Sequence, residues 1–336
     1  MSISHLVQMT HRQATIIDMM EVTNPAIDPS YFKVLREAGI SGVHFAVAHD
    51  DFNTTMARLS KLHKMVGQVE GVAIATSAND IVRAKQDGKV ALIIGIQDGI
   101  PFEKDLDLLE VFHRLGVRIV QLAYSVQNYF GTGCFVKKDS GLTDLGYQAV
   151  KELNRLGILI DISHCGTQTA KDIMEASRDP VAFTHATPSA LVEMGARAKS
   201  DELLKALAAK GGVVGQMIWS PFCEQRTKMG TWPTLDDFIA LLMYMADVTS
   251  IDNVGLGLDV SPFFTKEFYA SWAAHSGGLM KPHATPSFEQ KYVSGFRGVE
   301  DTIKITESLL SRGLSVESTI KVLGGNWLRL LERVLK

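Results

Sequence analysis

The chain has 336 residues, of which 46% are hydrophobic and 21% are charged, an ordinary globular composition. Its formal net charge is −3 and its Lys and Arg residues form no block, which argues against a surface for nucleic acid or for an anionic membrane. No apolar stretch is long enough to cross a bilayer, and the N-terminus lacks the basic start and apolar run of a signal peptide. The three cysteines, Cys134, Cys165 and Cys223, are too few and too far apart for a disulfide framework. We therefore expect a cytoplasmic protein with reduced thiols.

Short β-branched runs recur along the chain. Most are apolar on nearly every residue, as expected for parallel strands that are covered on both faces. The runs that we interpret as strands are Thr15–Asp18, Gly42–Ala48, Val69–Ala75, Val90–Ile96, Val117–Leu122, Ile158–Ser163, Val181–His185, Gly212–Ile218 and Asn253–Leu258.

Helical patterns lie between these runs, and most end at a glycine, which is the residue preferred just past a helix C-terminus. The predicted helices are Pro29–Ala38, Ser77–Gln86, Asp105–Leu115, Thr143–Leu156, Thr167–Ser177 and Lys199–Ala209. Alternation of strand and helix predicts one parallel α/β domain over residues 1–336. Nine candidate strands fit a (β/α)8 TIM barrel with one extra or misassigned strand. A doubly wound sheet is the alternative, but no G-x-G-x-x-G follows the first strand.

Two regions interrupt this alternation. Residues 127–142 are rich in Gly and polar residues, and residues 259–299 form a long insertion with Gly, Pro, aromatic residues and two histidines, His275 and His283. Because a barrel builds its active site from loops at the C-terminal ends of its strands, we expect both regions to border that site.

Three polar residues terminate apolar strands: His164 in ILIDISH, His185 in VAFTH and Asp259 in VGLGLD. In a barrel all three would point into one mouth, because the C-terminal ends of the strands converge there. Any one strand-end histidine is more often a hydrogen-bonded structural residue. Two histidines with a carboxylate are a candidate metal or acid/base constellation.

Other polar residues lie at similar positions. Gln97 and Asp98, in IIGIQDG, directly follow an apolar strand. Asp98 is either a metal ligand or a base, or it is a turn residue ahead of Gly99. Arg197, in MGARAKSDE, is either a clamp for a substrate carboxylate or a surface cation near a helix start; the residues alone favour the surface cation.

Several long motifs, in order, resemble the membrane (renal) dipeptidase family. The stretch NYFGTGCFVKKDSGLTDLGYQAVKELNRLGILIDISHCG is similar to the family's Asn, Gly-x-Gly, Gly-Leu-Thr, Asn-Arg-Leu-Gly and Asp-x-Ser-His pattern. FTHATPSAL resembles its Ser-His-Ser segment, ARAKSDELLKALAAKGGVVGQ its Arg-Asn-x-x-Asp segment, VGLGLDV its Gly-Ser-Asp-Phe-Asp strand end, and GGNWLRLL its C-terminal helix. The likeness is good over residues 88–336 and weak over the first 87.

This resemblance implies a (β/α)8 amidohydrolase-like barrel that, in the family, holds two zinc ions. His164 and His185 match the two histidine ligands of one zinc, and Asp259 matches the acid/base aspartate. Arg197 matches the arginine that binds the substrate carboxylate. Tyr124 stands where members of the family carry a histidine or tyrosine near the scissile bond.

Asn128 opens the Gly-x-Gly segment of the same pattern. By the resemblance it is a further substrate-binding residue, beside Tyr124 and Arg197.

The rest of the family's metal site is altered. Its first strand ends in Asp-Gly-His-x-Asp, and here Met20 and Val22 fall on the two ligand positions, neither of which binds zinc well. The bridging carboxylate of a Glu-Gly-Gly segment is replaced by Gln97, an uncharged amide that bridges two dications poorly. Glu21 or Asp98 could compensate only if the register shifted by one residue.

The favoured hypothesis is a metallo-hydrolase with at most one zinc ion, held by His164, His185 and a third ligand among Gln97, Asp98 and Asp259. Its substrate would be a small amide with a carboxylate, either a dipeptide or an N-acyl or N-substituted amino acid. The alternative is a metal-free member with different chemistry or a non-catalytic binding role. A two-zinc dipeptidase is the least favoured reading. The sequence does not determine the oligomeric state, and a homodimer is one of the assemblies that it allows.

Overall fold

The computed structural model describes residues 2–22, 28–48, 51–261, 265–267, 269–270 and 286–336. Its strands are β1 (Ile16–Val22), β2 (Ile40–Ala48), β3 (Val72–Ile74), β4 (Val90–Ile96), β5 (Val117–Val120), β6 (Leu159–Ile160), β7 (Ala182–Ala186), β8 (Val213–Gln216) and β9 (Val254–Leu256). All nine predicted strands are present, with ends that differ by a few residues. Val90–Ile96 was predicted to the residue.

The strands form a closed parallel barrel. Their order is β6-β5-β4-β2-β1-β9-β8-β7, and a parallel bridge between Asp161 and Ala182 joins β6 to β7 at the two ends of this order. The Ile162 amide donates to the Ala182 carbonyl at 2.8 Å across the same seam. Closure through eight neighbouring strands confirms the TIM-barrel prediction.

The ninth strand is β3, which among the described residues pairs with β4 alone and lies off the barrel path. It is the extra strand that the sequence pattern left unassigned. Because β2 occupies one edge of β4 and β5 pairs with the other edge only from Ile94 to Ile96, β3 can pair with the start of that second edge, from Val72–Val90 to Ile74–Leu92.

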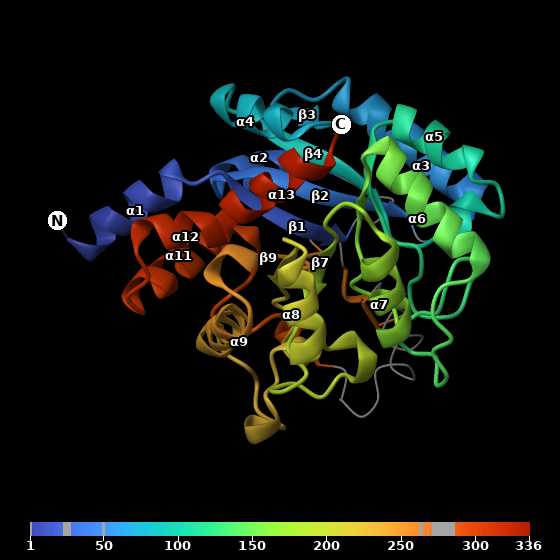
Figure 1. The fold of residues 1–336 in the computed structure, drawn as a ribbon. Coiled ribbons are helices and arrows are strands. Elements are labelled where there is room, and N and C mark those ends of the chain that lie inside the picture. The colour runs from blue at the N-terminus through green and yellow to red at the C-terminus, as the bar shows by residue number, and fades with distance from the viewer. Residues whose placement is uncertain (1, 23–27, 49–50, 262–264, 268, 271–285) are drawn as a thin grey trace.

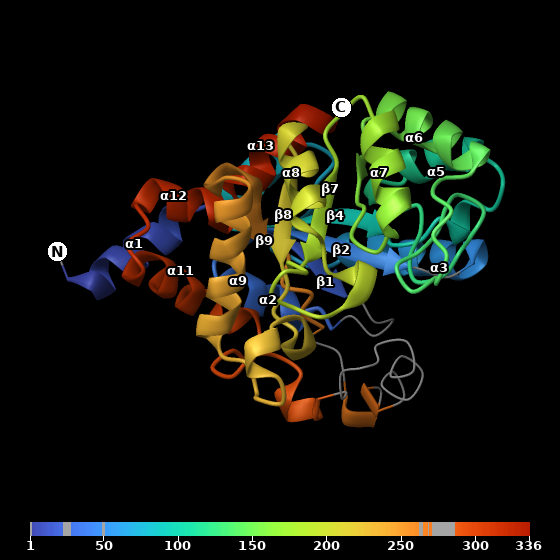
Figure 2. The ribbon, with the colours of Figure 1, turned by 60° about the horizontal axis from the view of Figure 1, so that its bottom comes forward.

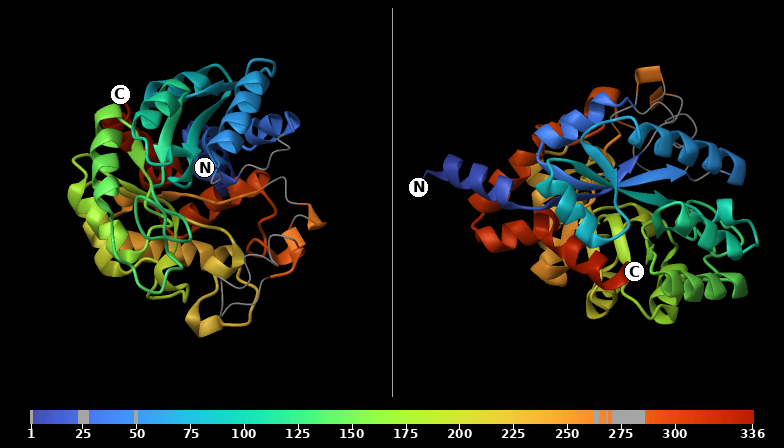
Figure 3. Two further views of the ribbon diagram at one scale, coloured as in Figure 1. Left: turned by 90° about the vertical axis from the view of Figure 1, so that its right-hand side faces the viewer. Right: turned by 90° about the horizontal axis from the view of Figure 1, so that it is seen from above.

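Helices lie outside the strands (Figures 1, 2 and 3). Their bounds are α1 Ile3–Gln13, α2 Ser30–Glu37, α3 Phe52–Val66, α4 Ala78–Gln86, α5 Asp107–Arg114, α6 Asp144–Leu156, α7 Thr167–Ala176, α8 Asp201–Ala209, α9 Leu235–Val248, α11 Thr302–Ser311, α12 Val316–Ile320 and α13 Asn326–Val334. The six predicted helices correspond to α2 and α4 to α8.

Helix α6 shows how the sequence sets these elements. The Thr143 hydroxyl accepts from the Gly146 amide at 3.0 Å and so satisfies one of the free amides of the first turn. Ala149, Val150 and Leu153 recur at helical spacing and are fully buried against the core. The helix ends at Gly157, whose φ of 72° lies in the left-handed region that glycine adopts without strain.

The core has two layers. One lies between the barrel and its helices, and the other fills the barrel interior and the end of the barrel at which the strands begin. Trp327 of α13 belongs to the inner layer, is fully buried, and donates its indole N–H to the Leu256 carbonyl at 2.9 Å. With the N-terminal ends of the strands packed in this way, polar residues collect at the opposite, C-terminal ends.

The predicted insertion at residues 259–299 is only partly described. Residues 262–264, 268 and 271–285, with His275 and His283 among them, lie outside the described residues. Within the part of the chain that is described, no helix is long and apolar enough to serve as a membrane span.

Candidate active site

His164 and His185 face each other at the C-terminal ends of neighbouring strands. His185 lies in β7 and His164 follows β6, and their Nε2 atoms are 3.0 Å apart. Both side chains are buried. Burial lowers the pKa of His185 well below its usual value, and the nearby Arg197 lowers it further. His185 is therefore neutral at pH 7 and has one ring nitrogen available as an acceptor. The prediction that the barrel brings this pair together is confirmed.

Tyr124 lies flat against His164. The two ring centroids are 3.9 Å apart and the planes differ by 18°. Burial raises the pKa of the Tyr124 phenol above its usual range, with the negative charge of Asp259 as a second cause. The phenol therefore keeps its proton and can act as a hydrogen-bond donor beside the histidine pair.

Asp259 has an unusual backbone. Its φ is 59°, in the left-handed region that non-glycine residues rarely adopt. Its amide donates to the Met20 carbonyl at 2.9 Å, and its carbonyl accepts the indole N–H of Trp219. Burial raises the pKa of its carboxyl to about 6, and the charge of Arg197 opposes this rise. The two anchored backbone groups hold the carboxyl at the mouth.

Arg197 is buried, with 2% of its surface exposed, so the interpretation as a surface cation is wrong. A 3-10 turn, Gly195–Arg197, directs the side chain inward. Its Nη1 donates to the carbonyls of Ser163 and His185, at 3.1 and 2.9 Å, and its Nη2 lies 3.3 Å from Met217 Sδ. These contacts place the guanidinium directly beside both histidine-bearing segments.

These contacts leave one edge of the Arg197 guanidinium open. Within the described part of the chain, the Arg197 Nε–H and one Nη2–H make no hydrogen bond. Nε and Nη2 form the side-on edge with which arginine binds a carboxylate through two hydrogen bonds.

Met20 and Gln97 meet at the positions that the resemblance assigns to metal ligands. Gln97 Nε2 lies 3.4 Å from Met20 Sδ, and both side chains are buried. A thioether and an amide nitrogen supply neither charge nor a strong zinc ligand. The placement of Gln97 gives no support to its prediction as the third ligand of the histidine pair.

Glu21 and Asp18 belong to β1, the strand that also carries Met20. The β1–β2 register shifts between Asp18 and Glu21, which is the one-residue shift that could have recruited Glu21. Both carboxylate oxygens of Glu21 instead accept from the Tyr31 hydroxyl at 2.9 Å. Burial raises the pKa of Glu21 well above its usual value and that of Asp18 to about 7.

In the described part of the chain, no three His, Cys, Asp or Glu side chains gather as a metal-binding group. The histidine pair fits part of one site. Two imidazole nitrogens on one tetrahedral zinc, at about 2.0–2.1 Å from it, lie roughly 3.3 Å apart. The observed 3.0 Å between His164 and His185 is close to this separation.

A hydrogen bond between Asn128 and Asp98 joins the loop after β5 to the loop after β4. Asn128 Nδ2 donates to Asp98 Oδ1 at 2.6 Å and to the Leu122 carbonyl at 2.7 Å, while its Oδ1 accepts from the amides of Phe130 and Gly131. Asp98 also accepts from the Ile100 amide, as the turn interpretation requires. These bonds hold the loop that follows β5, and a role of Asn128 in substrate binding stays a prediction.

Sequence reasoning missed Thr184, Asp161 and Trp219. Thr184 is hydrogen-bonded to both His185 and Asp161. Trp219 donates its indole N–H to the backbone carbonyl of Asp259. The motif Asp-x-Ser-His contained Asp161, but only the closed seam between β6 and β7 places it against Thr184.

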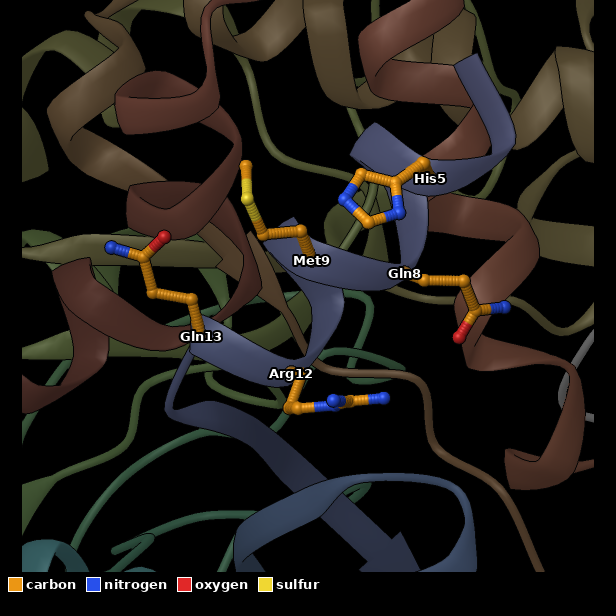
Figure 4. Close-up of a pocket in the computed structure, with 5 residues that line it drawn as sticks. All are labelled: His5, Gln8, Met9, Arg12 and Gln13. Carbon is orange, nitrogen blue, oxygen red and sulfur yellow. The ribbon is translucent and has the colours of Figure 1, made fainter. Parts of the chain in front are cut away.

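A separate hollow of about 380 Å³ lies on α1 (Figure 4). It is lined by His5, Gln8, Met9, Arg12 and Gln13. All five come from the one helix, which projects from the barrel (Figure 1). This hollow therefore shares no residue with the mouth.

Curated relatives match most of this chain. It is 25% identical over 292 residues to dipeptidase tcpJ of Claviceps purpurea, covering 86% of this chain and 62% of that protein. It is 24% identical over 338 residues to dipeptidase verJ of Clonostachys rogersoniana, covering 95% and 79%. The chain thus spans less than two thirds of the length of the Claviceps protein.

Solved structures share the fold. An amidohydrolase from Pseudomonas aeruginosa aligns with a TM-score of 0.88 and 32% identity over 100% of this chain and 99% of its own. A metallo peptidase from Rhodobacter sphaeroides, liganded with a phosphinate mimic of the dipeptide L-Ala-D-Ala, aligns with a TM-score of 0.80 and 20% identity over 96% and 99%.

The family match covers most of the chain. Residues 3–269 match the family described as membrane dipeptidase (peptidase family M19). The fold and the order of the motifs agree with it. The chain therefore belongs to the membrane dipeptidase family, a family of hydrolases of the dipeptidase type.

Proposed function

We propose that the protein hydrolyses the amide bond of a small substrate that carries a free carboxylate, either a dipeptide or an N-acyl or N-substituted amino acid. The observation that carries this proposal is the convergence of the His164–His185 pair with Arg197, whose guanidinium donates to the backbone of both histidine-bearing segments. The names of the fungal relatives support the same reaction class.

At most one zinc ion belongs to this proposal, and His164 and His185 would hold it. When bound, zinc would polarise the scissile carbonyl and lower the pKa of a water molecule. The contact between Met20 and Gln97 supports the limit of one, because no charged ligand stands at either position.

The side chains around the pair have complementary roles. Asp259 takes a proton from the attacking water and returns it to the leaving amine, and a carboxyl pKa near 6 suits a base that works near neutral pH. Tyr124 keeps its phenolic proton and donates to the oxygen that becomes negative. Arg197 offers the open edge of its guanidinium to the substrate carboxylate.

A second candidate is a metal-free member with other chemistry. The direct approach of the two Nε2 atoms favours it, since one imidazole can donate to the other and satisfy both without an ion. Location in the cytoplasm and assembly as a homodimer stay predictions from the sequence.

A substrate panel with metal analysis separates the two candidates. Purified protein, dialysed and then exposed to zinc, would be tested on dipeptides and N-acyl amino acids, each with a free and an amidated C-terminus. We expect turnover of the free acids only, with no more than one zinc per chain, and loss of both zinc and turnover in His164→Ala. Equal turnover of the amidated forms would contradict the role of Arg197, and zinc-independent turnover would favour the second candidate.

A further inference from the structure

A hydrogen-bonded network of buried polar side chains contacts His185 on its Nδ1 side. It comprises Asp161 and Ser163, which follow β6, and Thr184 of β7, all fully buried. Thr184 Oγ1 lies 2.6 Å from Asp161 Oδ2 and 2.7 Å from His185 Nδ1. None of these three side chains has a part in the proposed function.

The direction of each hydrogen bond follows from the number of protons. Asp161 Oδ1 accepts from the Ser163 amide at 3.0 Å, the Ser163 hydroxyl at 2.5 Å and the Thr184 amide at 3.1 Å. A carboxylate surrounded by donors in this way acts as an acceptor only. The single hydroxyl proton of Thr184 therefore points to Asp161 Oδ2, and the Thr184 oxygen must accept from His185.

This direction fixes the protonation of the imidazole. If Thr184 Oγ1 accepts, His185 carries its proton on Nδ1, and its Nε2 presents a lone pair toward His164. Asp161 cannot do this alone, because its Oδ2 is 3.8 Å from His185 Nδ1, beyond hydrogen-bond distance. The threonine hydroxyl is the required link between the carboxylate and the ring.

We propose that Asp161 and Thr184 are positioning residues that hold His185 in the Nδ1–H tautomer, so that its Nε2 always faces the mouth as an acceptor. The tautomer itself depends only on the described hydrogen bonds. Its consequence for catalysis rests on the proposed function, in which that lone pair would bind zinc. A fixed tautomer removes the competing form, which would present an N–H at the same place.

The sharpest test is Asp161→Asn, which keeps the shape but reverses one hydrogen bond. Three donors surround Oδ1, so the asparagine oxygen should take that place and its NH2 group should point to Thr184. The Thr184 hydroxyl must then donate to His185 Nδ1, and the imidazole proton moves to Nε2. Replacing a carboxylate by an amide beside a histidine is known to impose the wrong tautomer.

The readout is the 15N NMR spectrum of the histidine rings in metal-free protein, with His185 assigned by its loss in His185→Gln. We expect Nδ1–H for His185 in the unmodified chain, Nε2–H in Asp161→Asn, and a mixture in Thr184→Val. Thr187→Val is the matched control, since Thr187 is also buried at the end of β7 but donates to the Phe222 carbonyl at 2.8 Å. It should leave His185 in the Nδ1–H form.

Zinc binding and turnover give a second readout. Competition with a chelator should show zinc affinity lower by about 10- to 100-fold in Asp161→Asn, the usual effect of losing such a supporting group. For a substrate found by the panel, kcat should fall with little change in KM. Thr184→Ser keeps the hydroxyl and should therefore keep the Nδ1–H tautomer. It tests the role of the hydroxyl even if Thr184→Val fails to fold.

Two results would overturn the proposal: an Nε2–H tautomer of His185 in the unmodified protein, or an Nδ1–H tautomer that persists in folded Asp161→Asn. Failure of the proposed function looks different. If the tautomers behave as expected while no amide is hydrolysed and no zinc binds, the positioning role stands and only the assigned chemistry is lost.

Discussion

Replacing Arg197 by lysine separates its binding role from its structural one. The Arg197 Nη1 atom serves two carbonyls, those of Ser163 and His185, and its guanidinium carbon lies 5.3 Å from the centre of the Phe222 ring. A shorter ammonium cannot keep both bonds and the ring contact, and a buried hydrogen bond to a charged group contributes about 1.5–3 kcal/mol. We expect Arg197→Lys to lower the free energy of unfolding by about 2–4 kcal/mol. In a chain of this size that is a fall in Tm of roughly 3–6 °C.

The same variant should lose the two-pronged contact with the substrate carboxylate, so that kcat/KM falls by about 100-fold, mostly through KM. Differential scanning calorimetry and steady-state kinetics measure the two effects separately. Arg226→Lys is the control, because Arg226 is exposed and pairs with Glu193 at the surface, where such a pair contributes about 0–1 kcal/mol. An Arg197→Lys protein with unchanged Tm would refute the buried role, and unchanged kcat/KM would refute the carboxylate clamp.

Three further predictions concern the rest of the mouth. Trp219→Phe keeps the aromatic packing but removes the N–H that binds the Asp259 carbonyl. We expect kcat to fall by about tenfold and the free energy of unfolding in urea to fall by about 1–2 kcal/mol. Unchanged kcat would mean that the strained backbone of Asp259 needs no such anchor. Met20→His with Val22→Asp and Gln97→Glu should raise the zinc content, by elemental analysis, from at most one toward two per chain, and a content that stays at one would show that other ligands are missing. Because burial raises the pKa of Asp259 to about 6, kcat/KM should fall as the pH drops through 6, and an acid limb that survives in residual Asp259→Asn activity would exclude this carboxyl as the base. For stability the sign is opposite: the folded state favours the protonated carboxyl, so Asp259 reduces stability as the pH rises from about 4 to above 6, and Asp259→Asn should flatten this slope in thermal melts.

The amino-acid sequence by itself determined the elements and the direction of the strands. Apolar, β-branched runs such as Val90–Ile96 can be buried on both faces only as parallel strands, and alternation with helices leaves few architectures for them. It also determined that His164, His185 and Asp259 share one mouth. Residues that end parallel strands must meet at the same end of a barrel, whatever the strand order.

Only the tertiary structure decided which strands are neighbours and which side chains are buried. The seam between Asp161 and Ala182 and the place of β3 beside β4 depend on pairing between segments far apart in the chain, which no local pattern encodes. Arg197 reads as a surface residue in its own segment, and it is buried because carbonyls of two other strand ends accept its protons. Thr184 likewise has a role only because barrel closure brings Asp161 within 2.6 Å of it. Propensity and periodicity are local, whereas hydrogen-bond partners across a closed barrel are set by the whole chain at once.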